Sequence, residues 1–426
     1  MKYLLKGASV CTTEVMNKKD VLIDNGVIVS IDSTITDEDA FVVDLVGCTI
    51  FPGFTDVHVH FREPGFSYKE TIKSGSLAAA HGGYTTVCTM PNLKPVPDSI
   101  NNLKIQKDII EKDAVIQVIP YGSITKEEKG SVLSDMQEIA NDVIAFSDDG
   151  VGVQNDAIML DAMLKAKSLN KLIVAHCEDM QERNNGYIHD GKYAKEHGHI
   201  GINSASEWKQ VERDIELVKK TGCGYHVCHV STKESIELIR KAKEDGLDIS
   251  CETGPHYLIL TENDLKEDGR FKMNPPLRTN EDQTALLEGI KDGTIQMIAT
   301  DHAPHSAEEK SKGLKDSAMG IVGLETAFPV LYTNLVKSGI LSLQKLVYLL
   351  TDGPNKRFKI EKCIEVGKKA DLTVFNLNEE YEIHSDQFFS KGKATPFEGN
   401  KVNGKCLLTI SNGKIVYSAI NGVNNE

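Results

Sequence analysis

The five residues from Asp56 to His60 read Asp-Val-His-Val-His, and their types and spacing suggest metal chemistry. They close an apolar run that begins at Phe54 and predicts a β-strand. Because side chains alternate between the two faces of a strand, Asp56, His58 and His60 share one face and the valines take the other. Two imidazoles on one face can give two nitrogen ligands to one metal ion. The same spacing also fits a pair of histidines that line a core or a surface.

Histidine and aspartate recur where four later apolar runs end, at Asp149, His176, His229 and Asp301. Each of them alone would more often have a structural role. Their joint placement at the ends of predicted parallel strands instead favours one shared site. Nitrogen and carboxylate ligands without a thiolate suit zinc in a catalytic site, although manganese or cobalt could substitute. The sequence therefore predicts a zinc centre.

Several residues near these positions are interpreted as structural. His226 and His229 lie three positions apart on one predicted strand and face opposite sides, so only the one nearer the strand end, His229, is taken as a ligand. Cys177 and Cys228 neighbour proposed ligands with the opposite parity, which favours packing. His302 is expected to serve structure or to support the ligands. Surface or loop roles are expected for His81, His189, His197, His199 and His384, and surface salt bridges for Lys94 and Arg278.

The middle of the chain alternates apolar runs with longer helical segments, which is the sequence form of repeated βα units. Helical periodicity is clearest in Ile158–Ser168, Glu207–Lys220 and Glu234–Ala242. Eight units predict a closed, parallel α/β barrel of the (β/α)₈ type, in which chemistry takes place at the C-terminal ends of the strands. The predicted strands are Phe54–His60, Tyr84–Met90, Val115–Tyr121, Asp142–Phe146, Leu172–Cys177, Gly224–Val230, Asp248–Glu252 and Gln296–Thr300.

Both ends of the chain have a different pattern, with short β-like runs broken by turn signals. Ser411-Asn412-Gly413 joins two of these runs and is typical of a hairpin. The two ends are expected to form one small domain together. The runs are Tyr3–Leu5, Val21–Ile23, Val27–Ile31, Phe41–Asp44, Asp371–Phe375, Cys406–Ile410 and Lys414–Tyr417.

Composition narrows the function classes. The net charge of -14 over 426 residues, without a basic cluster, disfavours a nucleic-acid partner. Nine cysteines without CxxC spacing indicate a reducing compartment, and we expect a cytoplasmic protein. No stretch approaches the roughly 20 apolar residues of a membrane span, and the first residues do not resemble an export signal. We therefore expect neither a nucleic-acid nor a membrane partner.

Two segments of the chain resemble the signature segments of dihydroorotases, namely residues 52–60 (PGFTDVHVH) and 299–305 (ATDHAPH). The resemblance extends in family order through residues 90–92, 147–150, 175–178, 226–231 and 273–278. It implies the amidohydrolase fold, in which a distorted (β/α)₈ barrel carries a small β-sandwich built from both chain ends. The implied domains are residues 1–50 and 359–426 for the sandwich and 51–358 for the barrel.

The resemblance also implies a binuclear zinc site. By that likeness His58, His60 and Asp301 hold one ion, His176 and His229 hold the other, and Asp149 bridges them. Many relatives use a carboxylated lysine as the bridge, whereas residues 147–150 read Ser-Asp-Asp-Gly, which matches the family's bacterial class I branch. The residues implied to bind substrate are His60, Arg62, Asn92, Asn274, His305, Met319 and Gly320.

The implied reaction is the reversible closure of N-carbamoyl-L-aspartate to L-dihydroorotate in pyrimidine synthesis. Zinc would activate a water and polarise the carbonyl, and Asp301 would carry the proton to the leaving nitrogen. Arg62 has the strand parity of His60 if the strand continues, and its guanidinium can bind the ring carboxylate.

Two other functions compete with this interpretation. Hydantoinases, dihydropyrimidinases and allantoinases share the fold and metal chemistry, but Arg62 with Asn92 and the absent bridge lysine weigh against them. A metal-free chain that only organises aspartate carbamoyltransferase would have lost ligands, whereas every expected ligand is present here. The resemblance is compatible with a homodimer and with association with aspartate carbamoyltransferase.

Overall fold

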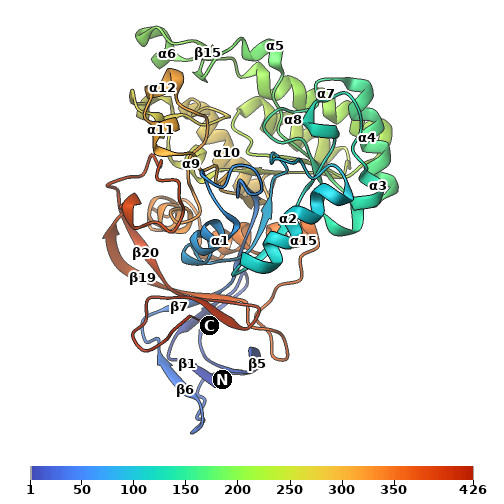
Figure 1. The fold of residues 1–426 in the computed structure, drawn as a ribbon. Helices are drawn as coiled ribbons and strands as arrows, with labels where there is room; N and C mark the ends of the chain where they lie inside the picture. Colours follow the sequence, from blue (N-terminus) through green and yellow to red (C-terminus); the bar gives the residue numbers. More distant parts are fainter. Residues whose placement is uncertain (1, 426) are drawn as a thin grey trace.

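A barrel with a small β domain beneath it makes up the computed structural model, which describes residues 2–425 (Figure 1). The parallel strands of the barrel follow one another in chain order around the ring. Their bounds are β8 Phe54–Val59, β9 Tyr84–Thr89, β10 Gln117–Pro120, β11 Gly122–Ser123, β12 Phe146–Ser147, β13 Ile173–Ala175, β16 Tyr225–Val227, β17 Ile249–Thr253 and β18 Met297–Ile298.

Hydrogen bonds at two places complete the ring. Tyr121, between β10 and β11, donates its backbone N–H to Thr89 on one side, while Gly122 donates to Ala145 on the other. A parallel bridge joins Val59 at the end of β8 to His302, just beyond β18. The eight predicted barrel strands are therefore confirmed, with β10 and β11 together forming the third. The fifth, sixth and eighth are shorter than predicted. The fourth overlaps its predicted range only at Phe146, because residues 140–142 form a 3₁₀ turn and the ladder begins after them.

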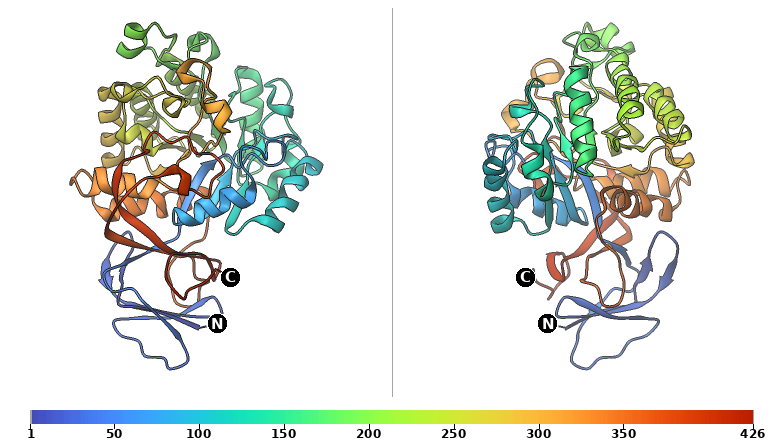
Figure 2. Two further views of the ribbon diagram at one scale, coloured as in Figure 1. Left: turned by 60° about the vertical axis from the view of Figure 1, so that its left-hand side comes forward. Right: turned by 90° about the vertical axis from the view of Figure 1, so that its right-hand side faces the viewer.

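Helices surround the barrel and fill the connections between its strands (Figures 1 and 2). The helical periodicities predicted for the fourth, fifth and sixth units are confirmed by α4, α7 and α8. Thr232 and Thr279 accept hydrogen bonds from backbone N–H groups and so define where α8 and α10 begin. The longer helices are α1 Ile72–His81, α2 Ile100–Asp113, α4 Asp156–Ser168, α7 Ala205–Thr221, α8 Lys233–Glu244, α10 Asn280–Asp292, α14 Leu343–Leu350 and α15 Asp352–Phe358.

Shorter elements occupy the loops. At the C-terminal face of the barrel, β14 Ile188–His189 pairs with β15 Gly201–Ile202. In Figure 1 this pair and α6 lie at the end of the molecule opposite the small β domain. The short helices are α3 Met136–Ile139, α5 Met180–Arg183, α6 Lys192–His197, α9 Pro255–Ile259, α11 Ala307–Lys310, α12 Gly313–Asp316 and α13 Ala327–Leu331.

The two chain ends lie together in the small β domain, as Figure 2 shows from two further sides. One sheet has the order β21-β20-β19-β7-β2-β3 and so mixes strands from both ends, while the other, β5-β4-β1-β6, comes from the N-terminal end. Their strands are β1 Lys2–Lys6, β2 Ser9–Cys11, β3 Met16–Lys18, β4 Asp20–Asp24, β5 Val27–Asp32, β6 Phe41–Asp44, β7 Thr49–Pro52, β19 Leu372–Glu382, β20 Lys401–Ser411 and β21 Lys414–Ser418.

Side chains from both sheets share one core that includes Leu5, Ile23, Ile50, Val374 and Ile410. The predicted hairpin is present, because Asn412 and Gly413 both have positive φ angles, 49° and 82°, as a two-residue turn with a right-handed twist requires. The expectation that the ends fold together is thus met by the pairing of β19 with β7. The boundaries at residues 50 and 358 remain a proposal.

An aromatic cluster joins the small domain to the barrel. Phe51 of β7 and Phe375 of β19 pack against Phe54 of β8 and Phe328 of α13, with ring centroids 4.3 to 5.9 Å apart. All four side chains are fully buried. Such contacts fix the start of β8 and hence the strand that carries His58. Among residues 2–425, no helix is both long and apolar enough to cross a bilayer.

Candidate metal and substrate site

The predicted metal ligands converge at the C-terminal ends of the barrel strands. His58 lies in β8 and His60 directly after it, and the other four follow β12, β13, β16 and β18. All six are between 0 and 7% exposed. All of them except His58 line a cavity of about 200 Å³, whose walls are formed by His60, Arg62, Asn92, Asp149, Gly150, His176, Arg183, His229, Asn274, Asp301, Ala303, His305, Met319 and Gly320.

One group of donor atoms gathers His58, His60 and Asp149, with Asp301 beside them. His58 Nε2 lies 3.4 Å from Asp149 Oδ1 and 3.5 Å from Asp301 Oδ1. His60 Nε2 lies 3.4 Å from Asp149 Oδ2 and 3.0 Å from Asp301 Oδ1. Two nitrogens and two carboxylates therefore face a common point.

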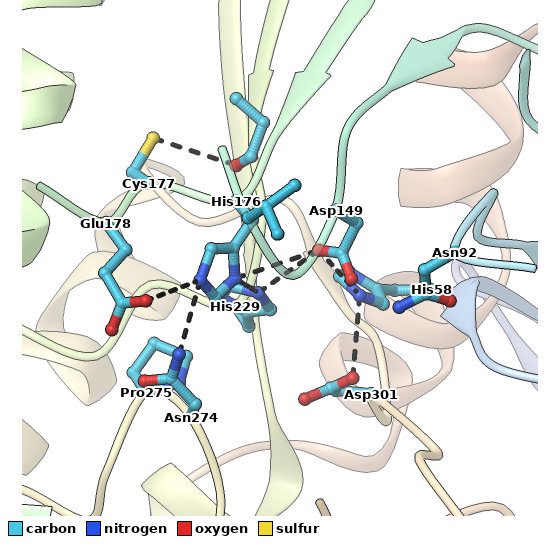
Figure 3. A network of polar contacts seen from close by, with 12 residues as sticks. His58, Asn92, Asp149, His176, Cys177, Glu178, His229, Asn274, Pro275 and Asp301 are labelled. Carbon is cyan, nitrogen blue, oxygen red and sulfur yellow. Dashed lines mark hydrogen bonds and ion pairs between the residues drawn. The ribbon is translucent and has the colours of Figure 1, made fainter. Parts of the chain in front are cut away.

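A second group gathers Asp149, His176 and His229 (Figure 3). His176 Nδ1 lies 2.9 Å from His229 Nε2, and these two atoms lie 3.8 and 3.6 Å from Asp149 Oδ1. Asp149 belongs to both groups, with Oδ1 near three imidazoles and Oδ2 near His60. None of the residues lining the cavity is a lysine.

These donors suit a divalent cation. Among the described residues, His58 Nε2 and Asp149 Oδ1 are buried without a hydrogen-bond partner, an arrangement that costs free energy unless something else binds them. Burial raises the pKa of the Asp149 carboxyl, but the charges of His58 and His60 and the nearby His229 imidazole, 3.6 Å away, hold it well below its ordinary value. The pKa of Asp301 is likewise lowered, because the hydrogen bond with His60 outweighs its burial. Both carboxylates are therefore ionised at neutral pH and available as ligands.

Buried partners hold the imidazoles from behind. His58 Nδ1 lies 2.8 Å from Glu252 Oε1, and the other carboxylate oxygen lies 3.0 Å from His226 Nε2. Since Glu252 can only accept, His58 donates from Nδ1 and turns Nε2 toward Asp149. The sequence reasoning missed Glu252, although a lone carboxylate at the end of the otherwise uncharged strand β17 is a usable signal. It placed His226 outside the site, and the structure shows that it supports the site from below.

The outer nitrogens of His60 and His176 face residues predicted to bind substrate. His60 Nδ1 lies 2.9 Å from Asn92 Oδ1. His176 Nε2 lies 3.4 Å from Asn274 Nδ2 and 3.6 Å from a Glu178 carboxylate oxygen. Glu178 is a further residue that the sequence analysis did not single out. The amides of Asn92 and Asn274 thus connect the metal side of the cavity to its other walls.

Arg62 lines the cavity as predicted, but its backbone conformation differs from the extended one that was expected. Strand β8 ends at Val59, and Arg62 has a left-handed φ of 56°, so the strand does not continue and the parity argument is wrong. Its guanidinium nevertheless lines the cavity and donates from Nε to the Pro304 carbonyl at 3.3 Å. The side chain is 9% exposed and forms no ion pair with any carboxylate of residues 2–425. A buried guanidinium without a carboxylate partner is able to bind an anion.

His305 and the Met319-Gly320 backbone complete this wall. His305 Nε2 donates to the Met319 carbonyl at 2.8 Å, and Lys69 Nζ lies 3.2 Å from His305 Nδ1. Burial and the positive charges of Arg62 and Lys69 hold the pKa of His305 well below its ordinary value, so the ring stays neutral. Lys69 and Arg183, which also lines the cavity, were not anticipated.

Three residues of the site have backbone φ angles in the left-handed region. Arg62, His229 and Asp301 have φ angles of 56°, 31° and 47°. Such angles are uncommon for residues other than glycine and concentrate where function requires a particular direction of the side chain. His302, the next residue in the chain, is fully buried; its Nδ1 accepts from Gly323 N–H at 3.2 Å and its Nε2 lies 3.4 Å from Glu70. These contacts agree with the structural role expected of His302.

The other residues interpreted as structural lie outside the cavity lining. Arg278 is 4% exposed and donates from Nη1 to His189 Nδ1 and to the Ile202 carbonyl, both at 3.1 Å. The expected surface salt bridge of Arg278 and the expected surface role of His189 are therefore both wrong, because the two side chains are buried against each other. Cys177 packs 3.3 Å from the Tyr225 hydroxyl. Cys228 lies near His58 and Glu252, where these three residues form a further potential ligand group.

Solved structures of known proteins share the whole architecture. The L-hydantoinase (dihydropyrimidinase) of Arthrobacter aurescens superposes with a TM-score of 0.87 at 26% identity, covering 99% of this chain and 97% of that one. A D-hydantoinase superposes equally well, at 24% identity. The protein has a (β/α)₈ barrel joined to a β-sandwich from both chain ends, and histidines and aspartates cluster at the C-terminal face of the barrel. These features define it as a metal-dependent cyclic amidohydrolase.

Relatives in sequence narrow the class. The family model for dihydro-orotase-like proteins matches residues 47–235. A dihydroorotase of Fusobacterium nucleatum is 50% identical over 97% of this chain and 98% of its own length, and one of Bacillus cytotoxicus is 48% identical over 98% of both chains. This chain belongs to the dihydroorotase family.

Proposed function

We propose that this protein is a dihydroorotase, which closes N-carbamoyl-L-aspartate to L-dihydroorotate and water, and reopens the ring, in pyrimidine biosynthesis. The observation that carries the proposal is the buried Arg62 guanidinium, which lacks a carboxylate partner and lines the same cavity as the candidate metal ligands. Dihydroorotate has a carboxylate on its ring, and the unsubstituted rings of hydantoin and dihydrouracil do not. A bidentate pair between that carboxylate and Arg62 would orient the ring amide toward the ligand groups.

The two ligand groups favour two zinc ions. His58, His60 and Asp301 would hold one ion, His176 and His229 the other, and Asp149 would bridge them with its two oxygens. Zinc bound there supplies Lewis-acid polarisation of the amide carbonyl and an activated water. The place of Asp149 in both groups supports this assignment, since no lysine lines the cavity.

Asp301 is the proposed catalytic residue. Its lowered pKa keeps the carboxylate ionised and ready to accept a proton at neutral pH. Oδ1 faces His60 and His58, which leaves Oδ2 to take the proton from the attacking water. The same oxygen then protonates the ring nitrogen as the amide bond breaks. In ring closure Asp301 performs these two transfers in reverse.

The remaining cavity residues position the substrate. Asn274 and Asn92 can hydrogen-bond polar ring atoms while they contact His176 and His60. His305 is neutral and fixes the Met319 carbonyl, so the backbone at Met319 and Gly320 forms a firm wall opposite the ligands. His60 is placed to touch both a metal ion and the substrate. These contacts favour a small, polar, anionic ring.

The main alternative is a hydantoinase, which the likeness of the solved structures favours at the level of fold. An assay of the full chain with measured zinc content separates the two. We expect turnover of dihydroorotate and carbamoyl aspartate, far lower rates on hydantoin, dihydrouracil and allantoin, and about two zinc ions per chain. A higher kcat/KM for hydantoin than for dihydroorotate would overturn the proposal. A measured content of one zinc ion per chain would overturn only the proposed second ion and leave the proposed reaction in place.

We further propose a cytoplasmic protein, because all nine cysteines are unpaired and seven of them are buried thiols. A homodimer and an association with aspartate carbamoyltransferase are compatible with the family. Sedimentation of the protein alone and mixed with that transferase would test both.

A further inference from the structure

A buried ammonium group lies behind the substrate wall. Lys310, the last residue of α11, is 7% exposed and does not line the cavity. Its Nζ donates to three backbone carbonyls, those of Lys272 at 3.0 Å, Ala318 at 2.7 Å and Gly320 at 2.7 Å. Among the described residues no carboxylate forms an ion pair with it. An ammonium group has three N–H donors, so the three carbonyls use all of them.

This arrangement is costly and therefore informative. A buried charge is normally neutralised by an opposite charge, and here only carbonyl dipoles compensate for the lost solvation. Burial, with the nearby Lys272 ammonium, lowers the pKa of Lys310 to about 7. A methionine or leucine would fill the same space without that cost. The geometry of three converging carbonyls points to a role in fixing backbone rather than in filling space.

The three carbonyls belong to the two segments that form the substrate wall. Residues 272–274 include Asn274, and residues 318–320 include the Met319 and Gly320 backbone. Apart from Lys310, the Gly320 N–H joins these segments by donating to the Lys272 carbonyl at 3.1 Å. That carbonyl thus accepts from both Gly320 and Lys310. One ammonium ties both segments to α11, which begins two residues after His305.

We propose that Lys310 is a positioning residue that sets the substrate affinity of this enzyme by holding the wall of Asn274, Met319 and Gly320 in its binding geometry. The inference rests on the proposed function for the identity of the substrate. Lys310 touches neither the ligands nor the cavity, so its effect passes through backbone. Since the wall contacts substrate in the ground state and the transition state alike, its loss raises KM much more than it lowers kcat.

The test compares Lys310→Met with Lys312→Met, a change at an exposed lysine of the same segment. Lys310→Met should raise KM for dihydroorotate about tenfold or more, the equivalent of roughly one unsatisfied buried carbonyl, with kcat within about threefold and zinc content unchanged. Lys310→Gln keeps two N–H donors on a shorter stem and should lie between Lys310→Met and wild type. Lys312→Met should match wild type.

Hydrogen exchange supplies a readout that does not depend on turnover. In Lys310→Met and Lys310→Gln the amides of residues 272–274 and 318–320 should exchange faster, with the barrel strands unchanged. If wild type turns over dihydroorotate and both variants keep wild-type KM and wild-type exchange there, the inference is wrong. A parallel loss of zinc and kcat would also overturn it. If wild type fails on dihydroorotate while the exchange changes as expected, the proposed function fails and the role in positioning stands.

Discussion

The two sides of the cavity are built in different ways. The metal side consists of side chains at strand ends, including His58, His176 and His229. Each is positioned by the adjoining barrel strand, and buried partners such as Glu252 orient the imidazoles. The substrate side consists of loop residues, a left-handed Arg62 and two backbone segments fixed by Lys310. Its parts come from residues 62, 272–274 and 305–320, which no single element carries.

The difference shows how binding and chemistry are divided in this molecule. A metal cluster tolerates little variation in distance, and strands in a closed barrel supply that rigidity. A substrate wall has to match one ring and can be changed by loops without disturbing the barrel. Changes on the metal side should therefore abolish turnover, while changes on the substrate side should alter affinity and specificity.

The largest expected effect comes from removing a metal ligand. His176→Ala should nearly abolish turnover and reduce bound zinc from about two ions to about one, because Nδ1 is one of the few donors of its group. Zinc content and kcat are measured on the same preparation, and circular dichroism reports whether the barrel is intact. Near-normal turnover with full zinc content would remove His176 from the metal side.

The next effect tests the substrate side. Arg62→Met should cost roughly 2–5 kcal/mol in kcat/KM for dihydroorotate, the range for breaking a buried charge pair, with zinc content unchanged. Arg62→Lys should restore only part of the kcat/KM that Arg62→Met loses, because lysine has a positive charge but lacks the planar guanidinium. Dihydrouracil, which has no carboxylate, should respond much less, and the two substrates with two enzymes form a cycle that isolates the pair. Equal losses on both substrates would mean that Arg62 only supports structure.

A smaller effect should come from the layer behind the metal ligands. Burial raises the pKa of Glu252, but hydrogen bonds from His226 and His58 lower it to about 2, so the group is a carboxylate at any working pH. Glu252→Gln removes that charge and should weaken zinc binding about 10–100-fold without changing the preference for carboxylated substrate. Chelator competition measures the affinity, and Glu244→Gln at an exposed site of α8 is the control. Unchanged zinc affinity would show that His58 needs no such partner.

The smallest effect concerns acid and the buried contact of His189 with Arg278, which lies outside the cavity lining. Burial and the charge of Arg278 lower the pKa of His189 to about 4, below the roughly 6.5 of an unfolded chain. The unfolded chain therefore binds a proton that the folded chain does not, and stability falls as pH falls from about 6.5 to 4, by at most about 1.4 kcal/mol per pH unit. Between pH 7 and pH 5 the urea midpoint of the His189→Gln variant should fall less than the urea midpoint of wild type. An equal shift in both would exclude His189 as a source.

Much of the metal side was predictable because local patterns encode it. The period of two in β8 puts His58 and His60 on one face, and the ends of eight parallel strands must meet at one rim. The strand count, the pairing of the chain ends and the six candidate ligands follow from such patterns. The family resemblance, and not the pattern, supplied the division of ligands between two ions.

The substrate side could be predicted only by resemblance, and the one physical argument made for it failed. Arg62 was expected to extend a strand that in fact ends at Val59, because nothing local to the sequence signals a left-handed residue there. His189 was expected to have a surface or loop role, yet it is buried and contacts Arg278, 89 residues further along. Contacts of this kind depend on which loops meet.

Local patterns in the sequence specify the barrel, the pairing of the two chain ends and the set of side chains able to hold metal, since hydrophobic period and turn chemistry act over a few residues. Long-range packing is needed to establish which nitrogen of His58 faces Asp149 and where the Arg62 guanidinium lies. It alone brought the carbonyls of Lys272, Ala318 and Gly320 to one ammonium group. The physical reason is that a hydrogen bond between distant segments requires both to be already placed, and only packing of the whole chain places them.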